Sequence, residues 1–235
     1  MKKLANRVAI VTGAGSGIGQ GIARRLAADG ASVVIAEMNA DTGDAVAQAI
    51  QQDFGVPASA FQVDMCDKAQ VQAMVKHTVN TFGTVDILVN NAWAARRGAR
   101  PFTPVEDKAD EDFAHAFNIG YMAALWTMQA VFPYMRDKRW GRIINLASLN
   151  GVNAHPYTVD YNAAKEALRA LTRTAAREWA QCIRFAAMLF APPPALQPMR
   201  NLPQLNQTTP LNCLSLIRWV AWVILRQILA GLPRF

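Results

Sequence analysis

The stretch RVAIVTGAGSGIGQGIARRLA, residues 7–27, decides the fold of this chain. It begins with a run of β-branched and other apolar residues, passes through the glycine-rich loop TGAGSGIG at residues 12–19, and continues with helical periodicity. A buried strand, a tight turn and a helix form the unit that opens a parallel α/β sheet. The stretch therefore predicts a strand over residues 7–13 and a helix over residues 17–29.

The glycine loop also predicts a phosphate site. Glycines at 13, 17 and 19 let the backbone approach a pyrophosphate, which then binds the free N–H groups of Ser16, Gly17, Ile18 and Gly19 at the helix N-terminus. The spacing is G-x-x-x-G-x-G, which differs from the common G-x-G-x-x-G fingerprint. A tight glycine turn without a ligand is the alternative, and the strand-loop-helix context favours the phosphate site.

The chain continues as alternating strands and helices. Strands are predicted at residues 31–37, 59–64, 85–92 and 142–148, and helices at 41–53, 67–82, 106–136 and 160–181. Residues 183–190 fit a sixth strand, but prolines in the following APPPALQP cannot continue a ladder. We expect one doubly wound α/β domain over residues 1–190, with three layers, and an atypical tail over 191–235 that leaves the last strand missing.

Composition narrows the class of protein. The chain has 235 residues, 52% of them hydrophobic, which suits one large core. Its three cysteines have no disulfide or metal-ligand spacing, so we expect a reducing, cytoplasmic setting and no metal. No apolar run approaches the roughly 18 residues needed to span a bilayer. Residues 182–235 hold five arginines and no acid, so the net charge of +7 belongs mostly to the tail and nucleic acid is not expected as a partner.

Glu37 ends the second predicted strand. A carboxylate at this position accepts hydrogen bonds from adenosine ribose hydroxyls and repels a 2′-phosphate. No lysine or arginine stands at positions 14, 16 or 38 to neutralise that phosphate. The pattern favours NAD over NADP; the alternative is a solvated glutamate at a strand end.

Tyr161 and Lys165 lie four residues apart in a predicted helix and therefore on one face. Because a nearby cation favours phenolate, we expect the pKa of Tyr161 to fall from about 10 toward the range of a general acid or base. Ser148, at the end of a predicted strand, can donate a hydrogen bond to a substrate oxygen. A Tyr-x-x-x-Lys pair alone is common on helices, but its combination with Ser148 and the glycine loop is specific.

In this order the features resemble the short-chain dehydrogenase/reductase family, in its single-domain, NAD-linked form. The resemblance runs through residues 7–181 and rests on TGAGSGIG, Glu37, VDMCD around Asp64, NNA at residues 90–92, Asn118, Ser148, and Tyr161 with Lys165. It implies a Rossmann fold and reversible oxidation of a secondary alcohol to a carbonyl by hydride transfer with a nicotinamide cofactor. Family members commonly form tetramers or dimers, so a homo-oligomer is expected.

The resemblance also implies a role for each position. Tyr161 would shuttle the proton, Lys165 would hold the nicotinamide ribose, and Asn118 would hold a water that links Lys165 to solvent. Beyond the glycine loop and Glu37, the implied cofactor-binding positions are Asp64 and Met65 beside the adenine, and Asn90 and Ala92 elsewhere along the cofactor. A small-molecule alcohol or carbonyl compound is the expected substrate, with its identity open.

The chain departs from the family at two places. Family members usually follow NNA with glycine, whereas this chain has Trp93, whose indole either crowds the cofactor or turns into the loop. After Gln181 the family continues with a strand, a Pro-Gly turn, a substrate lid and a final strand. Here prolines follow instead, and then the arginine-bearing stretch RWVAWVILRQILAG at residues 218–231.

We hypothesise that a frameshift near residues 181–187 replaced the C-terminus. In the shifted frame, each new codon consists of the third base of one codon and the first two bases of the next. Trp219 followed by Val220 then encodes glycine, and so does Trp222 followed by Val223. Both glycines fall where the family resemblance expects them. One alternative is a genuine tail whose residues 214–230 form an amphipathic helix on a membrane surface, on a partner or against the domain itself. Another is a catalytically impaired dehydrogenase with an exposed sheet edge. Sequencing the coding DNA distinguishes the frameshift from a genuine tail.

Overall fold

A parallel sheet organises the chain. The computed structural model describes residues 2–100, 102–180, 184–190 and 228, and in these residues six strands pair in the order β3-β2-β1-β4-β5-β6. The strands are β1 (Val8–Thr12), β2 (Ser32–Glu37), β3 (Ala58–Gln62), β4 (Ile87–Asn90), β5 (Arg142–Ser148) and β6 (Arg184–Phe190). All neighbouring pairs are parallel, so the doubly wound α/β prediction is confirmed.

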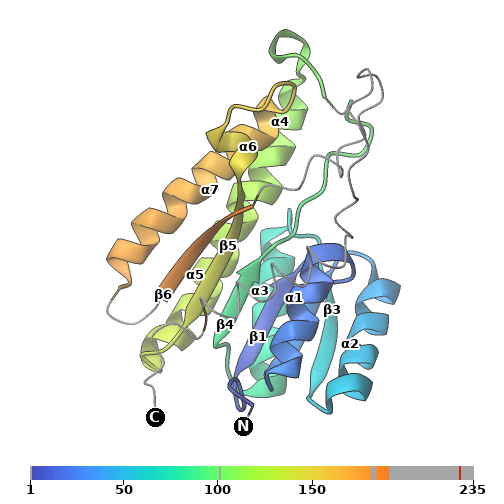
Figure 1. The fold of residues 1–235 in the computed structure, drawn as a ribbon, viewed down its shortest axis with the longest axis vertical. Coiled ribbons are helices and arrows are strands. Elements are labelled where there is room, and N and C mark those ends of the chain that lie inside the picture. Colours follow the sequence, from blue (N-terminus) through green and yellow to red (C-terminus); the bar gives the residue numbers. More distant parts are fainter. Residues whose placement is uncertain (1, 101, 181–183, 191–227, 229–235) are drawn as a thin grey trace, which may run out of the picture.

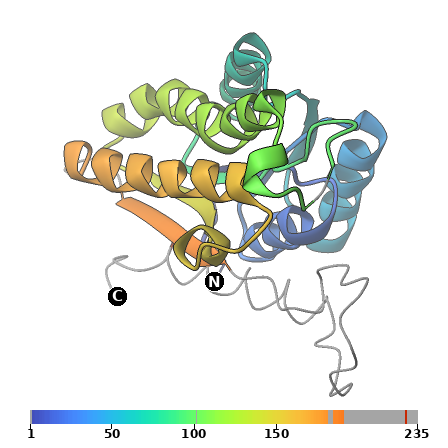
Figure 2. The ribbon, with the colours of Figure 1, turned by 90° about the horizontal axis from the view of Figure 1, so that it is seen from above.

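Helices cover both faces of this sheet (Figures 1 and 2). The helical elements are α1 (Gly17–Ala28), α2 (Ala40–Phe54), α3 (Lys68–Phe82), η1 (Val105–Asp107), α4 (Asp110–Phe117), η2 (Asn118–Met122), α5 (Ala123–Asp137), α6 (Leu149–Val152) and α7 (Val159–Glu178). Figure 2 shows α3, α5 and α7 on one face and α1 on the other. The predicted three-layer arrangement is therefore present.

Two hydrophobic clusters form the core, one on each face. The first joins α1 and α2 to the sheet through side chains such as Ile22, Leu26 and Ile50. The second joins α3 and α5 to the sheet through side chains such as Met74 and Met128. Every residue of β1, β4 and β5 is buried. For this reason β1 and β4 are nearly continuous apolar runs rather than alternating ones.

The strand order reverses beside β1, which pairs with β2 on one side and β4 on the other. The connections after these strands leave in opposite directions, so a crevice opens at the carboxyl ends of the strands. Thr12, Glu37, Asn90 and Ser148 each end a strand. The fold therefore gathers the predicted site residues at one edge of the sheet.

The helical segment predicted over residues 106–136 is divided. A short 3₁₀ turn, η1, precedes α4, and the five residues of η2 form a π-helical turn between α4 and α5. The N–H of Ala123 donates to the carbonyl oxygen of Asn118 five residues earlier. This wider turn begins at Asn118, a predicted site residue, and π-bulges inside α-helices are frequent at functional sites.

The predicted sixth strand is confirmed as β6, in register with β5 from Arg142↔Arg184 to Ser148↔Phe190. The predicted tail, with its missing last strand and its possible amphipathic helix, lies outside the described residues except at Ile228. Ile228 is helical, 1% exposed, and part of the first core cluster. Nε of Arg142 donates to its carbonyl oxygen at 3.1 Å, so this residue of the tail packs on the domain.

Candidate active site

The glycine loop has the backbone that its sequence predicts. Gly13 and Gly17 adopt positive φ values of 62° and 55°, a region that side chains with a Cβ rarely occupy. A Cβ at Gly19 would collide with the carbonyl oxygen of Gly13. At Gly17 a Cβ would meet nothing within 4 Å, so the space in front of the loop is open at the point where a phosphate group would approach.

The N-terminus of α1 has backbone N–H groups that could bind an anion. Its N-cap, Ser16, makes no side-chain capping bond, and the first turn of the helix holds no acidic residue. The early N–H groups and the positive end of the helix dipole therefore have no side-chain anion of their own. A phosphate group would satisfy both.

Thr12 and Asn91 brace this loop, and neither was predicted as a site residue. The hydroxyl oxygen of Thr12 accepts hydrogen bonds from the N–H groups of Asn91 and Ala92, both at 3.0 Å. Nδ2 of Asn91 donates to the carbonyl oxygens of Thr12 and Gly13 at 2.8 and 3.1 Å. Their position at the ends of two adjacent strands is the sequence signal that identifies them.

Glu37 lies against the same loop. Its Oε2 accepts the N–H of Gly15 at 2.9 Å and its Oε1 accepts the N–H of Met38 at 2.9 Å. A Cβ at Gly15 would come within 2.7 Å of Cγ of Glu37, so Gly15 is required for this close approach and the sequence reading missed it. These hydrogen bonds fix the carboxylate beside the loop.

Ser148, Tyr161 and Lys165 converge from β5 and α7. Ser148 is 1% exposed, and its Oγ hydrogen-bonds with the Tyr161 hydroxyl and accepts the N–H of Asn150 at 3.1 Å. Lys165 is 4% exposed, and its Nζ donates to the carbonyl oxygen of Leu146 at 2.8 Å. The structure thus brings these three predicted residues together.

The expected effect of Lys165 on Tyr161 was wrong. Burial raises the pKa of Tyr161 above its usual value, and the hydrogen bond with Ser148 opposes that rise. Nζ of Lys165 lies 5.6 Å from the centre of the Tyr161 ring, so the cation faces the ring rather than sitting on the phenol oxygen. Burial also lowers the pKa of Lys165 to about 8, because the charged ammonium is poorly solvated there.

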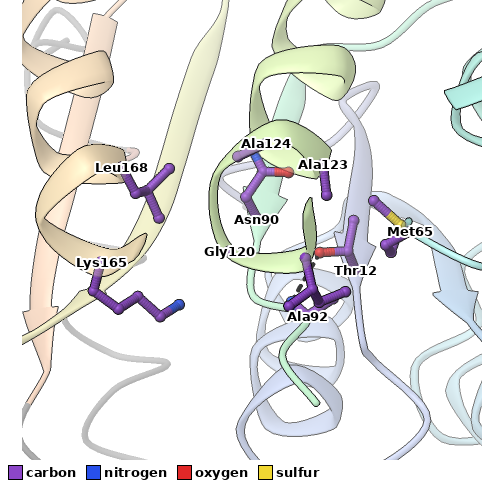
Figure 3. A pocket seen from close by; sticks show the side chains of 10 residues that line it. Thr12, Met65, Asn90, Ala92, Gly120, Ala123, Ala124, Lys165 and Leu168 are labelled. Atoms are coloured by element: carbon purple, nitrogen blue, oxygen red, sulfur yellow. Dashed lines mark hydrogen bonds between the residues drawn. The ribbon is translucent and has the colours of Figure 1, made fainter. Parts of the chain in front are cut away.

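A small cavity of about 10 Å³ separates Lys165 from the end of the sheet (Figure 3). Thr12, Met65, Asn90, Ala92 and Gly120 are among its lining residues. Figure 3 shows the Lys165 side chain pointing from α7 toward this space. Its volume suits about one water molecule.

Asn90 is held in place by a buried polar network. Its Nδ2 donates to Oδ1 of Asn145 at 2.8 Å, and its Oδ1 accepts the hydroxyl of Thr127 at 2.8 Å. Nδ2 of Asn145 donates to the hydroxyl of Thr172 at 2.8 Å. Because every partner belongs to a different element of the core, the network fixes the spacing of β4, β5, α5 and α7 beside the cavity.

The remaining predicted positions are more peripheral. Asn118 is exposed where it opens the π-helical turn. Oδ1 of Asp64 accepts the N–H of Cys66 at 2.8 Å, which holds the turn after β3. Met65, which follows it, is 5% exposed and reaches the cavity that Lys165 lines.

A larger pocket of about 360 Å³ lies on the Tyr161 side. Trp93, Phe102 and Tyr157 contribute aromatic walls. Two ion pairs border it: Nε of Arg96 lies 2.7 Å from Oδ1 of Asp112, and Nζ of Lys108 lies 3.1 Å from Oδ1 of Asp160. Asp112, which is 5% exposed, holds Arg96 in the pocket wall.

Trp93 turns inward. Its ring meets the Tyr161 ring edge-on, with centroids 4.6 Å apart and planes at 83°. Nζ of Lys165 lies 5.3 Å from the indole centroid. Of the two orientations that the sequence left open, the indole takes the one that crowds the site.

Within the part of the chain that the structure describes, no cluster of three or more His, Cys, Asp and Glu side chains could hold a metal ion. No helix among the same residues is long and apolar enough to cross a membrane.

Comparisons with known proteins agree with this geometry. The profile of the short chain dehydrogenase family matches residues 7–201. The diacetyl reductase [(S)-acetoin forming] of Staphylococcus epidermidis is 34% identical over 74% of this chain and 66% of its own. The galactitol 2-dehydrogenase of Agrobacterium fabrum is 37% identical over 74% of this chain and 65% of its own. This chain therefore spans just under two thirds of these relatives.

Two further relatives extend the comparison. The D-beta-hydroxybutyrate dehydrogenase of Cupriavidus necator is 36% identical over 76% of this chain and 67% of its own. The crystal structure of an NAD⁺-bound xylitol dehydrogenase superposes with a TM-score of 0.74 at 35% identity, covering 80% of this chain and 70% of that one. The fold is thus shared with an enzyme of this name, and about a third of the aligned sequence is shared with the other relatives.

Proposed function

Because this chain belongs to the short-chain dehydrogenase family, we propose that it is an NAD-linked oxidoreductase that interconverts a secondary alcohol and its ketone. The observation that carries this proposal is the convergence of buried Ser148 and Lys165 with the half-buried Tyr161 beside the glycine loop. The NAD⁺-bound structural relative supports the choice of cofactor, and so does the carboxylate of Glu37 against Gly15. NADP is the less favoured cofactor.

Each part of the site would hold a different part of the dinucleotide. The N–H groups at the start of α1, from Ser16 to Gly19, would bind the pyrophosphate. Glu37 would accept the adenosine ribose hydroxyls, with Asp64 and Met65 beside the adenine. Asn90, Ala92 and Lys165 would border the nicotinamide half. When bound, NAD supplies the hydride acceptor for alcohol oxidation, and NADH the donor for ketone reduction.

The proton is handled by the protein. In ketone reduction, the hydroxyl of Tyr161 would donate its proton to the substrate oxygen, and Ser148 would donate a hydrogen bond to the same oxygen as negative charge develops there. Burial raises the pKa of Tyr161 and so favours the protonated phenol that this direction needs. In alcohol oxidation the phenolate would take up the proton, and Lys165 with a water held at Asn118 would return it to solvent.

The pocket on the Tyr161 side would hold the substrate. Two of its cationic groups, Arg96 and Lys108, pair with Asp112 and Asp160. Arg100 also lines it, and aromatic side chains form other parts of its wall. The relatives are named for diacetyl, galactitol, xylitol and hydroxybutyrate. Small polyols and short hydroxyketones are therefore the first compounds to test.

We also propose a cytoplasmic location and a homo-oligomer. The spacing of the three cysteines supports a reducing compartment. The oligomer follows from the family resemblance, in which the helices that bear Asn118 and Tyr161 form the subunit contacts. Residues 1–190 are proposed as a single catalytic domain.

The test replaces Tyr161 with Phe, which keeps the ring that Trp93 contacts and removes only the hydroxyl. NADH formation from the polyols and hydroxyacids, and NADH consumption with the ketones, would be followed by absorbance. We expect kcat to fall by about 10²- to 10⁴-fold, with the Kd for NADH within about twofold of wild type because the hydroxyl acts on the substrate.

Tyr134→Phe is the matched control, because Tyr134 lies exposed on α5; its kcat should equal that of wild type. A Tyr161→Phe enzyme that keeps more than about a tenth of the wild-type kcat would contradict the assigned role.

A further inference from the structure

Trp93 stands between the two hollows of the site. It lines the pocket of about 360 Å³ together with Tyr161. Lys165, Gly120 and Ala92, the residue before Trp93, line the cavity of about 10 Å³. The indole also contacts Tyr161 on one side and faces Lys165 on the other. The two central catalytic side chains therefore border different spaces, with the indole between them.

The indole of Trp93 is held in its position by contacts with its neighbours. Its edge-on contact with Tyr161 and its position over the Lys165 ammonium are both favourable geometries for an aromatic ring. Gly120, in the π-helical turn η2, makes room for it: a Cβ at Gly120 would lie 2.8 Å from Cζ3 of Trp93. Gly120 has no positive φ, so the close approach of the indole explains the glycine.

This position conflicts with catalysis. The nicotinamide ribose has to reach Lys165, and the substrate has to reach Tyr161, so the two spaces must meet at the reacting atoms. With the indole in place, the space beside Lys165 holds about one water, which is far less than a nicotinamide ring needs. The larger pocket, by contrast, has room for a displaced indole.

We propose that Trp93 is a gating residue of the nicotinamide subsite: its indole closes the space between Tyr161 and Lys165 and must swing toward the larger pocket for the cofactor to bind fully. Trp93 lies in the loop between β4 and η1, outside any helix or strand, so rotation of its side chain disrupts no ladder. The inference rests on the proposed function. It predicts that apparent cofactor affinity is reduced by the fraction of molecules in the closed form.

The test compares NADH binding to the full chain and to Trp93→Gly, by NADH fluorescence titration. We expect the Kd of Trp93→Gly to be lower by roughly tenfold, because the contacts with Tyr161 and Lys165 no longer have to be broken. In stopped-flow mixing, the observed rate for wild type should level off with rising NADH, since indole movement becomes limiting, while that of Trp93→Gly should keep rising.

Two further variants make the outcome decisive. Trp93→Phe has a smaller ring against Gly120 and should bind NADH about threefold more tightly than wild type. If Trp93→Gly does not fold, the Kd of Trp93→Phe tests the gate instead. Trp179→Phe is the control, because Trp179 stacks on Phe132 away from the site; its Kd should match wild type.

Equal or weaker NADH binding in the folded Trp93 variants, with rates that do not level off in wild type, would overturn the gate while leaving the oxidoreductase proposal intact. If no folded variant and no wild-type protein binds NADH, the cofactor proposal fails, and the gate fails with it.

Discussion

At the scale of single residues, burial of Lys165 has a measurable thermodynamic consequence. Its pKa, lowered from 10.5 to about 8 by desolvation, means that keeping the ammonium charged in the fold costs about 3 kcal/mol at pH 7. A variant that lacks this ammonium also leaves the carbonyl oxygen of Leu146 without its hydrogen bond, which costs about 1 kcal/mol. The buried ammonium of Lys165 therefore lowers the stability of the fold.

Lys165→Met should therefore raise the free energy of unfolding at pH 7 by roughly 2 kcal/mol. Between pH 8 and 10.5 the unfolded wild-type chain keeps a proton at Lys165 that the folded protein has released. The unfavourable contribution of Lys165 should therefore decrease with pH in that window, and the deficit of the wild type relative to the variant should shrink. Urea denaturation from pH 7 to 10.5 measures this, with exposed Lys68→Met as the control. A deficit that stays constant across the window would refute the prediction.

Some properties of the site's side chains could be predicted from the sequence, and others could not. The four-residue spacing placed Tyr161 and Lys165 on one helix face, and Glu37 lies at the glycine loop as its strand-end position predicts. The pKa of Tyr161 was predicted in the wrong direction, because helical spacing says nothing about how deeply a phenol is buried. The inward turn of Trp93 depends on the room at Gly120, which is distant in sequence, so no local pattern reports it.

At the scale of the elements, Asp86 joins the amino ends of the strands to a helix. It is fully buried, accepts the N–H of Val8 at 3.0 Å, and forms ion pairs with Arg7 at 3.2 Å and Lys138 at 2.7 Å. These partners tie the starts of β1 and β4 to the residue after α5. This edge is opposite to the carboxyl ends that bear the site, so its role is in stability.

Asp86→Asn should lower the free energy of unfolding by about 3 kcal/mol, because both cations lose a buried counter-charge. Asp137→Asn is the matched control: its ion pair with Arg136 has side chains 55% and 67% exposed, and surface pairs contribute little. Its loss should stay below about 0.5 kcal/mol. Equal losses in the two variants, measured by urea denaturation, would show that Asp86 does not join these elements as argued.

The elements themselves follow from simple patterns. Apolar runs and glycine turns predict all six described strands, and helical periodicity predicts α1, α2, α3 and α7. The π-helical turn at Asn118 was not predicted, since it keeps apolar residues on the buried side and changes only the hydrogen-bond partner from four to five residues away. Such a change leaves no mark in the hydrophobic pattern.

At the scale of the whole molecule, the candidate site and the ion pairs of the buried Asp86 lie at opposite ends of the strands of one sheet. The glycine loop, Glu37, Asn90 and Ser148 lie at the carboxyl ends of the strands, and the Asp86 cluster lies at the amino ends. The order of motifs along the chain predicts this arrangement, because parallel strands bring successive loops to the same edge. The family profile over residues 7–201 agrees with that reading.

The C-terminal quarter of the chain carries conflicting sequence patterns. Ile228, the one described residue of the tail, packs in the core. The frameshift remains a hypothesis, and the coding DNA tests it: a shifted frame that does not continue as a family-like sequence past codon 235 would refute it.

The most direct test of the central claim is a fluorescence titration of the full 235-residue chain with NADH and, separately, with NADPH. We expect saturable binding of NADH and weaker binding of NADPH, because the carboxylate of Glu37 would accept ribose hydroxyls and repel a 2′-phosphate. Binding of neither compound to a folded sample, or tighter binding of NADPH, would contradict it.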